Sequence, residues 1–160
     1  MRLLTIVSGG QTGVDRAALD VAIQLNISHG GWCPADRLAE DGSIPTSYNL
    51  VELPTRLYPD RTRQNVVDSD GSLILYLHRL QGGTALTLKF AREHHRPHLQ
   101  VRLDREPNKD RVREWIEHNE IQKLNIAGPR ASSSPKIYSM AFRFLTEVFE
   151  GWMESSSPKA

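Results

Sequence analysis

The sequence predicts an α/β protein with a single doubly wound, mostly parallel sheet flanked by helices. Three times along the chain, an apolar strand leads into a glycine-bearing loop and then into an amphipathic helix. The three loops are residues 8–13, 81–84 and 128–133. Because strand–helix–strand connections are right-handed and place successive strands in parallel, this repetition favours one continuous sheet with helices on its faces.

The first unit begins with an apolar strand over residues 3–7, and a helix is expected from about Val14. Its apolar residues recur at i, i+4, i+7, i+8 and i+11, namely at Val14, Ala18, Val21, Ala22 and Leu25. Such a stripe indicates a helix that buries one face. A second, short strand is expected to end at residues 30–34. The polar run from there to Tyr48 is expected to be a loop, with the length typical of functional or mobile loops. A short helix is expected over residues 60–68.

The second unit contains a nearly continuous apolar strand over residues 72–77. This is the pattern of a central parallel strand that is covered on both faces. The helix that follows is expected to end before Pro97. Alternation over residues 99–103 predicts another strand, and Asn108 is suited to cap the next short helix.

The third unit consists of a strand over residues 124–127, a loop and the last helix. This helix has the clearest helical period in the chain, carried by Ile137, Met140, Ala141, Phe144, Leu145 and Val148. Ser134 followed by Pro135 predicts the N-cap and the first helical position.

Length and composition favour a single domain, which we expect over residues 1–152, with a disordered tail over residues 153–160. The 20 Lys and Arg residues nearly balance the 19 Asp and Glu residues, so no basic footprint for nucleic acid or an anionic membrane is expected. Cys33 is the only cysteine, which excludes an internal disulfide and favours a reducing compartment. No signal peptide and no apolar run of roughly 20 residues is present, so a cytoplasmic protein is expected.

The three glycine loops are candidates for an anion site. In a doubly wound sheet they all emerge at the carboxyl edge, where backbone amides and helix N-termini attract phosphate. The candidate ligand-binding residues are Gly9, Gly10, Gln11, Thr12, Gly13, Gly82, Gly83, Thr84, Arg130 and Ser132. One such loop fits a structural turn equally well, and Arg130 fits a solvated surface position. The convergence of three loops favours one shared site for a phosphate-bearing ligand. The first loop matches neither the dinucleotide fingerprint nor the Walker A pattern.

Residues 8–20, read Ser-Gly-Gly-Gln-Thr-Gly-Val-Asp-Arg-Ala-Ala-Leu-Asp, resemble the opening of the molybdenum cofactor carrier protein family. These are Rossmann-like proteins related to the lysine-decarboxylase-like nucleotide-binding proteins. The resemblance continues through residues 30–34, Arg37, 39–42, Ile44, Pro45, Tyr48, Arg61, Thr62, Asn65, Val66, 68–71, 82–84 and 128–130. It implies a homo-oligomeric carrier that holds the molybdenum cofactor, a phosphate-bearing molybdopterin, and hands it to molybdoenzyme apoproteins.

The pterin ring implied by this resemblance needs amide and carboxylate partners. Gln11, Asp15, Glu40, Asp41 and Asn65 are available for this role. Of these, Gln11, Glu40 and Asn65 are predicted to bind the cofactor, together with Arg16. Asp15 and Arg16 can equally pair at the helix start or face solvent.

Metal ligation by the protein itself is not expected. A Cys33 thiolate is a chemically suitable ligand for molybdenum, but a small buried residue packed beside Trp32 is the favoured interpretation. His78, His94, His95 and His98 lack the spacing of a metal site.

Two other functions remain open at this stage. The first is a phosphoribohydrolase-like enzyme of the same broad group. Such enzymes pair their glycine loops with a catalytic glutamate just after the second loop, whereas here no carboxylate follows Thr84 until Glu93. Glu40 or Asp41 could supply the carboxyl group that acid–base catalysis needs. The second is a protein that binds a nucleotide or an ADP-ribose-like ligand without catalysis.

Overall fold

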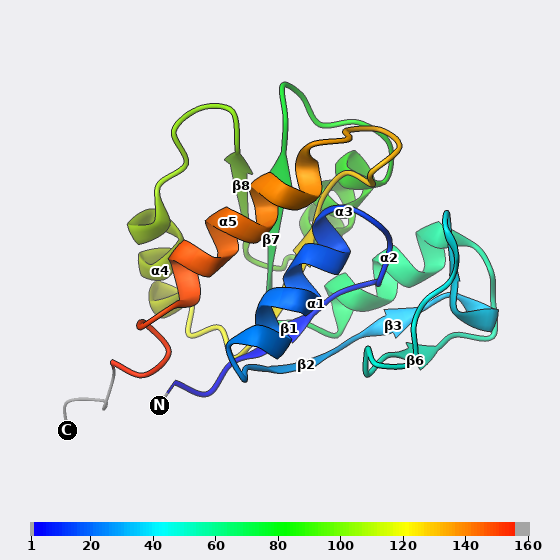
Figure 1. Cartoon of the computed structure of the whole chain (residues 1–160), viewed down its shortest axis with the longest axis horizontal. Helices are drawn as coiled ribbons and strands as arrows, with labels where there is room; N and C mark the ends of the chain where they lie inside the picture. The colour runs from blue at the N-terminus through cyan, green and yellow to red at the C-terminus, as the bar shows by residue number, and fades with distance from the viewer. Residues whose placement is uncertain (1, 156–160) are drawn as a thin grey trace.

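The computed structural model describes residues 2–155 and has a central sheet of five parallel strands. Its strands are β1 (Thr5–Val7), β2 (Ser28–Gly30), β7 (Gly71–Tyr76), β8 (His98–Arg102) and β9 (Lys123–Ala127). They lie in the order β2-β1-β9-β7-β8 (Figure 1). The predicted α/β fold class with a mostly parallel sheet is confirmed.

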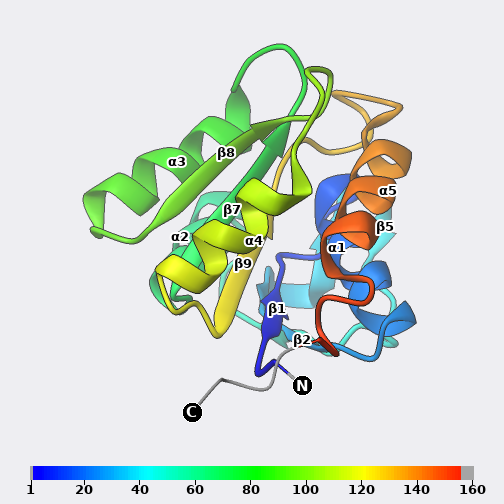
Figure 2. The same cartoon turned by 90° about the vertical axis from the view of Figure 1, so that its left-hand side faces the viewer.

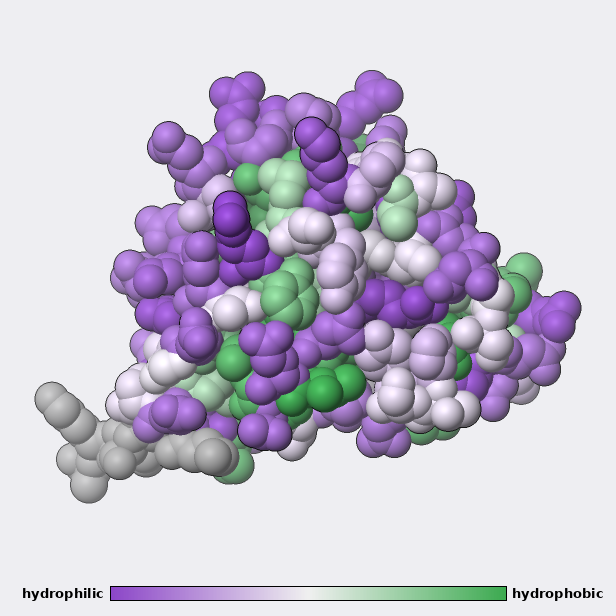
Figure 3. All heavy atoms as spheres, viewed as in Figure 1, coloured by the Kyte–Doolittle hydropathy of each residue, from purple (hydrophilic) through white to green (hydrophobic). Residues whose placement is uncertain are grey.

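Helices cover both faces of this sheet. They are α1 (Val14–Gln24), α2 (Tyr58–Val67), α3 (Gly82–Glu93), α4 (Lys109–His118) and α5 (Ile137–Phe149). Figures 1 and 2 show α1, α4 and α5 on one face and α2 and α3 on the other. α1 packs against α5, and both helices bury alanines such as Ala18 and Ala141, whose small side chains permit close approach. On this side of the molecule, hydrophilic residues surround smaller apolar areas (Figure 3).

The strand order has a familiar form when counting starts at β7. The strands β7, β8, β9, β1 and β2 then take the order 2-1-3-4-5 across the sheet, one of the two common doubly wound orders. The strand order reverses between β7 and β9, and ligands of doubly wound proteins bind at such a point.

The two ends of the described chain lie close together, because the backbone N–H of Arg2 donates to the Met153 carbonyl oxygen at 3.0 Å.

The segment between β2 and α2 is more regular than the loop predicted from its polar composition. It contains two small two-stranded sheets and a 3₁₀ helix, η1 (Ala35–Arg37). One sheet pairs β3 (Trp32–Cys33) with β6 (Val51–Glu52), and the other pairs β4 (Leu38–Ala39) with β5 (Gly42–Ser43). The guanidinium group of Arg37 donates hydrogen bonds to four backbone carbonyls in this segment, those of Ile44, Pro45, Tyr48 and Leu50. One arginine thus orders the chain where apolar periodicity is absent.

Two helix starts test the capping predictions. The Asn108 side chain accepts hydrogen bonds from the N–H groups of Asp110 at 2.9 Å and Arg111 at 3.3 Å, so its predicted cap is confirmed. The prediction for Ser134 and Pro135 is wrong, because α5 begins at Ile137. Residues 131–136 form successive turns instead, in which the Ser134 N–H donates to the Arg130 carbonyl oxygen at 3.2 Å.

The C-terminal boundary also differs from the prediction. Met153, expected to open a disordered tail, is 8% exposed and packs in the main core together with Trp152. Residues 156–160 of the predicted tail lie outside the described residues. Within the described chain, no helix combines the length and the apolar character that crossing a membrane requires.

Candidate ligand-binding site

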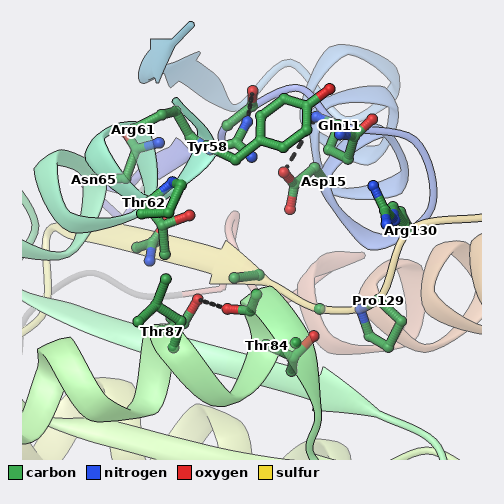
Figure 4. Close-up of a pocket in the computed structure, with 18 of the residues that line it drawn as sticks. Gln11, Asp15, Tyr58, Arg61, Thr62, Asn65, Thr84, Thr87, Pro129 and Arg130 are labelled. Atoms are coloured by element: carbon green, nitrogen blue, oxygen red, sulfur yellow. Dashed lines mark hydrogen bonds between the residues drawn. The ribbon is translucent and has the colours of Figure 1, made fainter. Parts of the chain in front are cut away.

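The three glycine loops lie together at one edge of the sheet. β1, β9 and β7 are parallel neighbours, so the loops that follow them emerge side by side. A pocket of about 300 Å³ opens at this edge, at the lower end of the range for small-ligand sites (Figure 4). It is lined by all three loops and by α2: Gly9, Gln11, Asp15, Tyr58, Pro59, Arg61, Thr62, Asn65, Gln81, Gly82, Gly83, Thr84, Leu86, Thr87, Asn125, Ile126, Ala127, Gly128, Pro129, Arg130 and Ser133.

The N-terminus of α3 supplies free amide groups to this pocket. Within the described chain, the N–H groups of Gly82, Gly83 and Thr84 have no hydrogen-bond acceptor, and the side chain of Gln81 does not cap them. A Cβ atom placed on Gly82 or Gly83 would meet nothing within 4 Å. Unpaired amides at the start of a twelve-residue helix carry partial positive charge, so this end of the pocket suits an anion.

The first glycine loop differs, because most of its amides are already bonded inside the protein. The Gly10 N–H donates to Ser8 Oγ at 3.3 Å, the Gln11 N–H to Asp15 Oδ2 at 3.2 Å, and the Thr12 N–H to Gln11 Oε1 at 3.0 Å. Gly13, at a φ of 82°, instead makes room for the third loop, since a Cβ there would overlap the Pro129 carbonyl oxygen. Gly13 therefore serves packing, and the amides of Gly10, Gln11 and Thr12 are not free to bind a ligand.

Glu40 joins the first and third loops beside the pocket. Its carboxylate accepts hydrogen bonds from the Thr12 hydroxyl and from both the N–H and the hydroxyl of Ser132, and it lies 3.6 Å from Arg130 Nε. Burial alone would raise the pKa of Glu40, but these hydrogen bonds and the charge of Arg130 hold that pKa below its ordinary value. We call Thr12, Glu40 and Ser132 the loop clasp.

Arg16 and Asn65 bind other parts of the protein. Arg16 donates to both carboxylate oxygens of Asp41 at 2.9 Å and to the Gly10 carbonyl oxygen at 2.7 Å. These hydrogen bonds, with the Arg16 charge, lower the pKa of Asp41. Asn65 faces the pocket, but its amide group holds the backbone N–H and C=O of Trp32 at 2.8 Å and 2.9 Å.

The predicted cofactor-binding residues thus divide into two groups. Those that line the pocket are Gly9, Gln11, Asn65, Gly82, Gly83, Thr84 and Arg130. Those that lie beside it are Gly10, Thr12, Gly13, Arg16, Glu40 and Ser132. Thr12, Glu40 and Ser132 form the loop clasp, Arg16 bonds to Gly10, and Gly13 packs against Pro129.

Two buried charged residues of the pocket, Asp15 and Arg61, were not among the predicted binding residues. Each is only 7% exposed. Arg61 Nη1 donates to the Gly9 carbonyl oxygen at 2.7 Å, and the Arg61 guanidinium carbon lies 5.4 Å from the centre of the Tyr58 ring. Burial raises the pKa of Asp15 to about 6, although Arg61, the Gln11 N–H and Arg16 oppose this rise. The sequence signal for Arg61 is its spacing of four residues from Asn65, which places both on one face of α2.

Cys33 lies away from the pocket. It is fully buried and packs in an apolar cluster with Leu19, Ala39, Ile44 and Leu50. Burial raises the pKa of its thiol, which disfavours the thiolate that metal ligation requires. Among the residues that the structure describes, no group of three or more His, Cys, Asp and Glu side chains is arranged to hold a metal ion.

A family model described as the circularly permutated YpsA SLOG family matches residues 6–149. The chain belongs to this family. The description agrees with a strand order that becomes a common doubly wound order when counting starts at β7.

A solved structure supports the same assignment. The crystal structure of a "Putative molybdenum carrier protein" from Syntrophus aciditrophicus SB is 49% identical to this chain, covers 93% of this chain and 96% of its own, and has a TM-score of 0.88. The resemblance drawn from residues 8–20 is thereby confirmed. A structure of (E)-4-hydroxy-3-methyl-but-2-enyl diphosphate reductase is 8% identical, with a TM-score of 0.40 over 90% of this chain and 59% of its own. No curated protein matches the chain.

Proposed function

We propose that this protein binds the molybdenum cofactor, protects it and transfers it to molybdoenzyme apoproteins, without catalysing a reaction itself. The observation that carries this proposal is the row of unpaired amides at the start of α3, set in a pocket at the point where the strand order reverses. The 49% identity to a protein described as a molybdenum carrier supports it.

In this proposal the two ends of the pocket hold different parts of the cargo. The phosphate group binds the amides of Gly82, Gly83 and Thr84, and Arg130 at the rim supplies a positive charge. The pterin ring lies toward Gln11 and Asp15. The cofactor brings its own dithiolene ligands for molybdenum, so the chain needs no metal ligand for the cargo.

Reversible contacts suit a carrier, because the cargo must be released. Backbone amides and one rim arginine bind a phosphate without a covalent bond. The proposal also places the protein in the cytoplasm as a homo-oligomer. Light scattering of the purified protein measures its oligomeric state.

Mass spectrometry of the protein purified under anaerobic conditions tests the function directly. Molybdopterin with its metal is the expected co-purifying ligand, and the loaded protein should reconstitute an apo-molybdoenzyme. If the purified protein carries a nucleotide instead and takes up no molybdopterin, the carrier function is wrong.

A second candidate function is hydrolysis of a nucleotide at its glycosidic bond. Asp15 carries the only carboxyl group among the residues that line the pocket, and a pKa of about 6 suits general acid–base catalysis near neutral pH. Incubation with AMP, followed by chromatography of free adenine, tests this activity. Release of adenine that Asp15→Asn abolishes would replace the carrier function with this one.

A further inference from the structure

One oxygen of the buried Asp15 carboxylate has no partner in the described chain. Oδ2 accepts a hydrogen bond from the Gln11 N–H at 3.2 Å, whereas Oδ1 accepts none. Figure 4 shows this carboxyl group projecting into the pocket between the first loop and α3. The residue is only 7% exposed, and a donor from a ligand in the pocket would give this oxygen the hydrogen bond that the described chain does not supply.

The charged side chains near Asp15 do not donate a hydrogen bond to Oδ1, so this oxygen can accept one from a ligand. Arg61 on α2 and Arg16 on α1 are the charged groups that act on Asp15 most strongly. Neither forms a hydrogen bond to it, because Arg61 donates to the Gly9 carbonyl and Arg16 donates to Asp41 and the Gly10 carbonyl. The other titratable or charged pocket residues are Tyr58 on α2 and Arg130 in the third loop, and α3 presents uncharged residues only.

The two ends of the pocket therefore favour ligand groups of opposite hydrogen-bonding character. The α3 end offers donors without acceptors, and the Asp15 end offers acceptors on a negative charge. A phosphate at the Asp15 end would meet a like charge, whereas it finds free amides at α3. This polarity fixes the direction in which a phosphate-bearing heterocycle can lie.

We infer that Asp15 binds the edge of a heterocycle that carries a ring N–H beside an exocyclic amino group, while the ligand phosphate lies at the amides of Gly82, Gly83 and Thr84. The 2-amino-4-oxopyrimidine edge shared by pterins and guanine has this pair of donors. Oδ1 and the second lone pair of Oδ2 can accept both hydrogen bonds. This inference rests on the proposed function and names the ring chemistry that the site selects.

Adenine should be rejected by the same geometry. Its amino group lies beside a ring nitrogen that is an acceptor, so one carboxylate oxygen would face a lone pair. Sites built around a specific hydrogen-bonding edge discriminate strongly against analogues that leave a buried polar group unpaired. Binding should also weaken below about pH 6, since burial raises the pKa of Asp15 to about 6 and the protonated carboxyl loses an acceptor.

Calorimetric titration with GMP, IMP, AMP, a pterin monophosphate and inorganic phosphate tests this inference. At about pH 8 the wild type should bind GMP about tenfold or more tightly than AMP, with IMP between them. Asp15→Asn should lower GMP affinity about tenfold or more while AMP and phosphate change by no more than about twofold. Retained phosphate binding shows that this variant keeps its fold. Glu150→Gln, which alters an exposed carboxylate after α5 and outside the pocket lining, is the control and should leave GMP affinity unchanged.

Equal affinities for GMP and AMP in the wild type would overturn the inference, and so would equal GMP affinities in wild type and Asp15→Asn. The relative affinities of GMP and the pterin monophosphate identify which source of this edge the site prefers. The same measurements distinguish failure of this inference from failure of the carrier function. Asp15-dependent binding of GMP without molybdopterin uptake removes the carrier function and supports the inference. Molybdopterin retention that is unchanged in Asp15→Asn supports the carrier function and removes the inference.

Discussion

Arg61 Nη1 lies 2.7 Å from the carbonyl oxygen of Gly9, and this hydrogen bond joins α2 to the first glycine loop. The two residues are 52 positions apart in the chain. A Cβ atom on Gly9 would lie 2.5 Å from Arg61 Cδ and 2.6 Å from Arg61 Nη1. Gly9 is therefore required because a buried arginine approaches the backbone there, and the same arginine lines the candidate binding pocket.

Gly9→Ala should destabilise the protein because Arg61 must move and lose this hydrogen bond. We expect a loss of about 1–3 kcal/mol in the free energy of unfolding, measured by urea denaturation. Gly83→Ala is the control, since its Cβ meets nothing within 4 Å and alanine favours a helix. Wild-type stability in Gly9→Ala would mean that Arg61 can leave its position without cost.

Asp15→Asn should stabilise the ligand-free protein near neutral pH. Burial raises the pKa of Asp15 to about 6 in the folded state from an ordinary value of 3.8, so the folded protein holds this proton more tightly than the unfolded chain. The wild type then loses stability as pH rises from about 4 to about 6, and this loss persists above that range. Denaturation at a series of pH values should show the variant about 1–3 kcal/mol more stable at about pH 8, with the difference shrinking toward about pH 4. A variant less stable than wild type at about pH 8 would contradict this expectation.

Glu40→Gln should loosen the loop clasp. The wild-type pKa of Glu40 lies below its ordinary value, so its contribution to stability is present above that ordinary pKa and is lost as pH falls through the lowered one. At neutral pH we expect the variant to lose about 1 kcal/mol and the amide of Ser132 to exchange faster with solvent, as followed by hydrogen exchange. Glu150→Gln, at an exposed residue after α5, should change neither measurement. Equal exchange rates at Ser132 in Glu40→Gln and wild type would exclude a role for the clasp.

Gly83→Val tests the proposal that the α3 end of the pocket binds the phosphate. A Cβ at Gly83 has free space, so the fold should persist while the branched side chain fills the volume in front of the α3 amides. We expect retention of the co-purified pterin to fall about tenfold or more, measured by fluorescence after oxidation. Ala85→Val, two residues further along α3 and outside the pocket lining, should retain the ligand. Full retention in Gly83→Val would place the phosphate elsewhere.

Cys33→Ser should affect stability and leave the ligand in place. The serine hydroxyl would lie in an apolar cluster with Leu19 and Ile44, which costs about 1–3 kcal/mol when no partner is available. Thermal unfolding measures this cost, and molybdenum content after gel filtration measures retention. Loss of molybdenum from a folded Cys33→Ser protein would show that the thiol binds the cargo.

The sequence by itself determined the fold class and the edge of the sheet at which the candidate site lies. The continuous apolar run of β7 and the apolar stripe of α1 are local patterns, set by the two-residue and 3.6-residue periods of strands and helices. Asn108 is a similar case, because a cap contacts amides only two and three residues ahead. Parallel strands then require the loops after β1, β7 and β9 to meet at one edge.

Only the tertiary structure decided which of the glycine loops presents free donors. In the sequence, residues 8–13 and 81–84 are equivalent glycine loops between a strand and a helix. In the folded chain, the Ser8, Asp15 and Gln11 side chains accept from the amides of Gly10, Gln11 and Thr12. Within the described residues, no acceptor pairs with the amides that begin α3. Arg61 is hidden from sequence patterns for the same reason, since its partner Gly9 lies far away along the chain. Hydrogen bonds between residues far apart in the sequence depend on how helices and strands pack in three dimensions. Local sequence periodicity predicts the helices and strands but not how they pack.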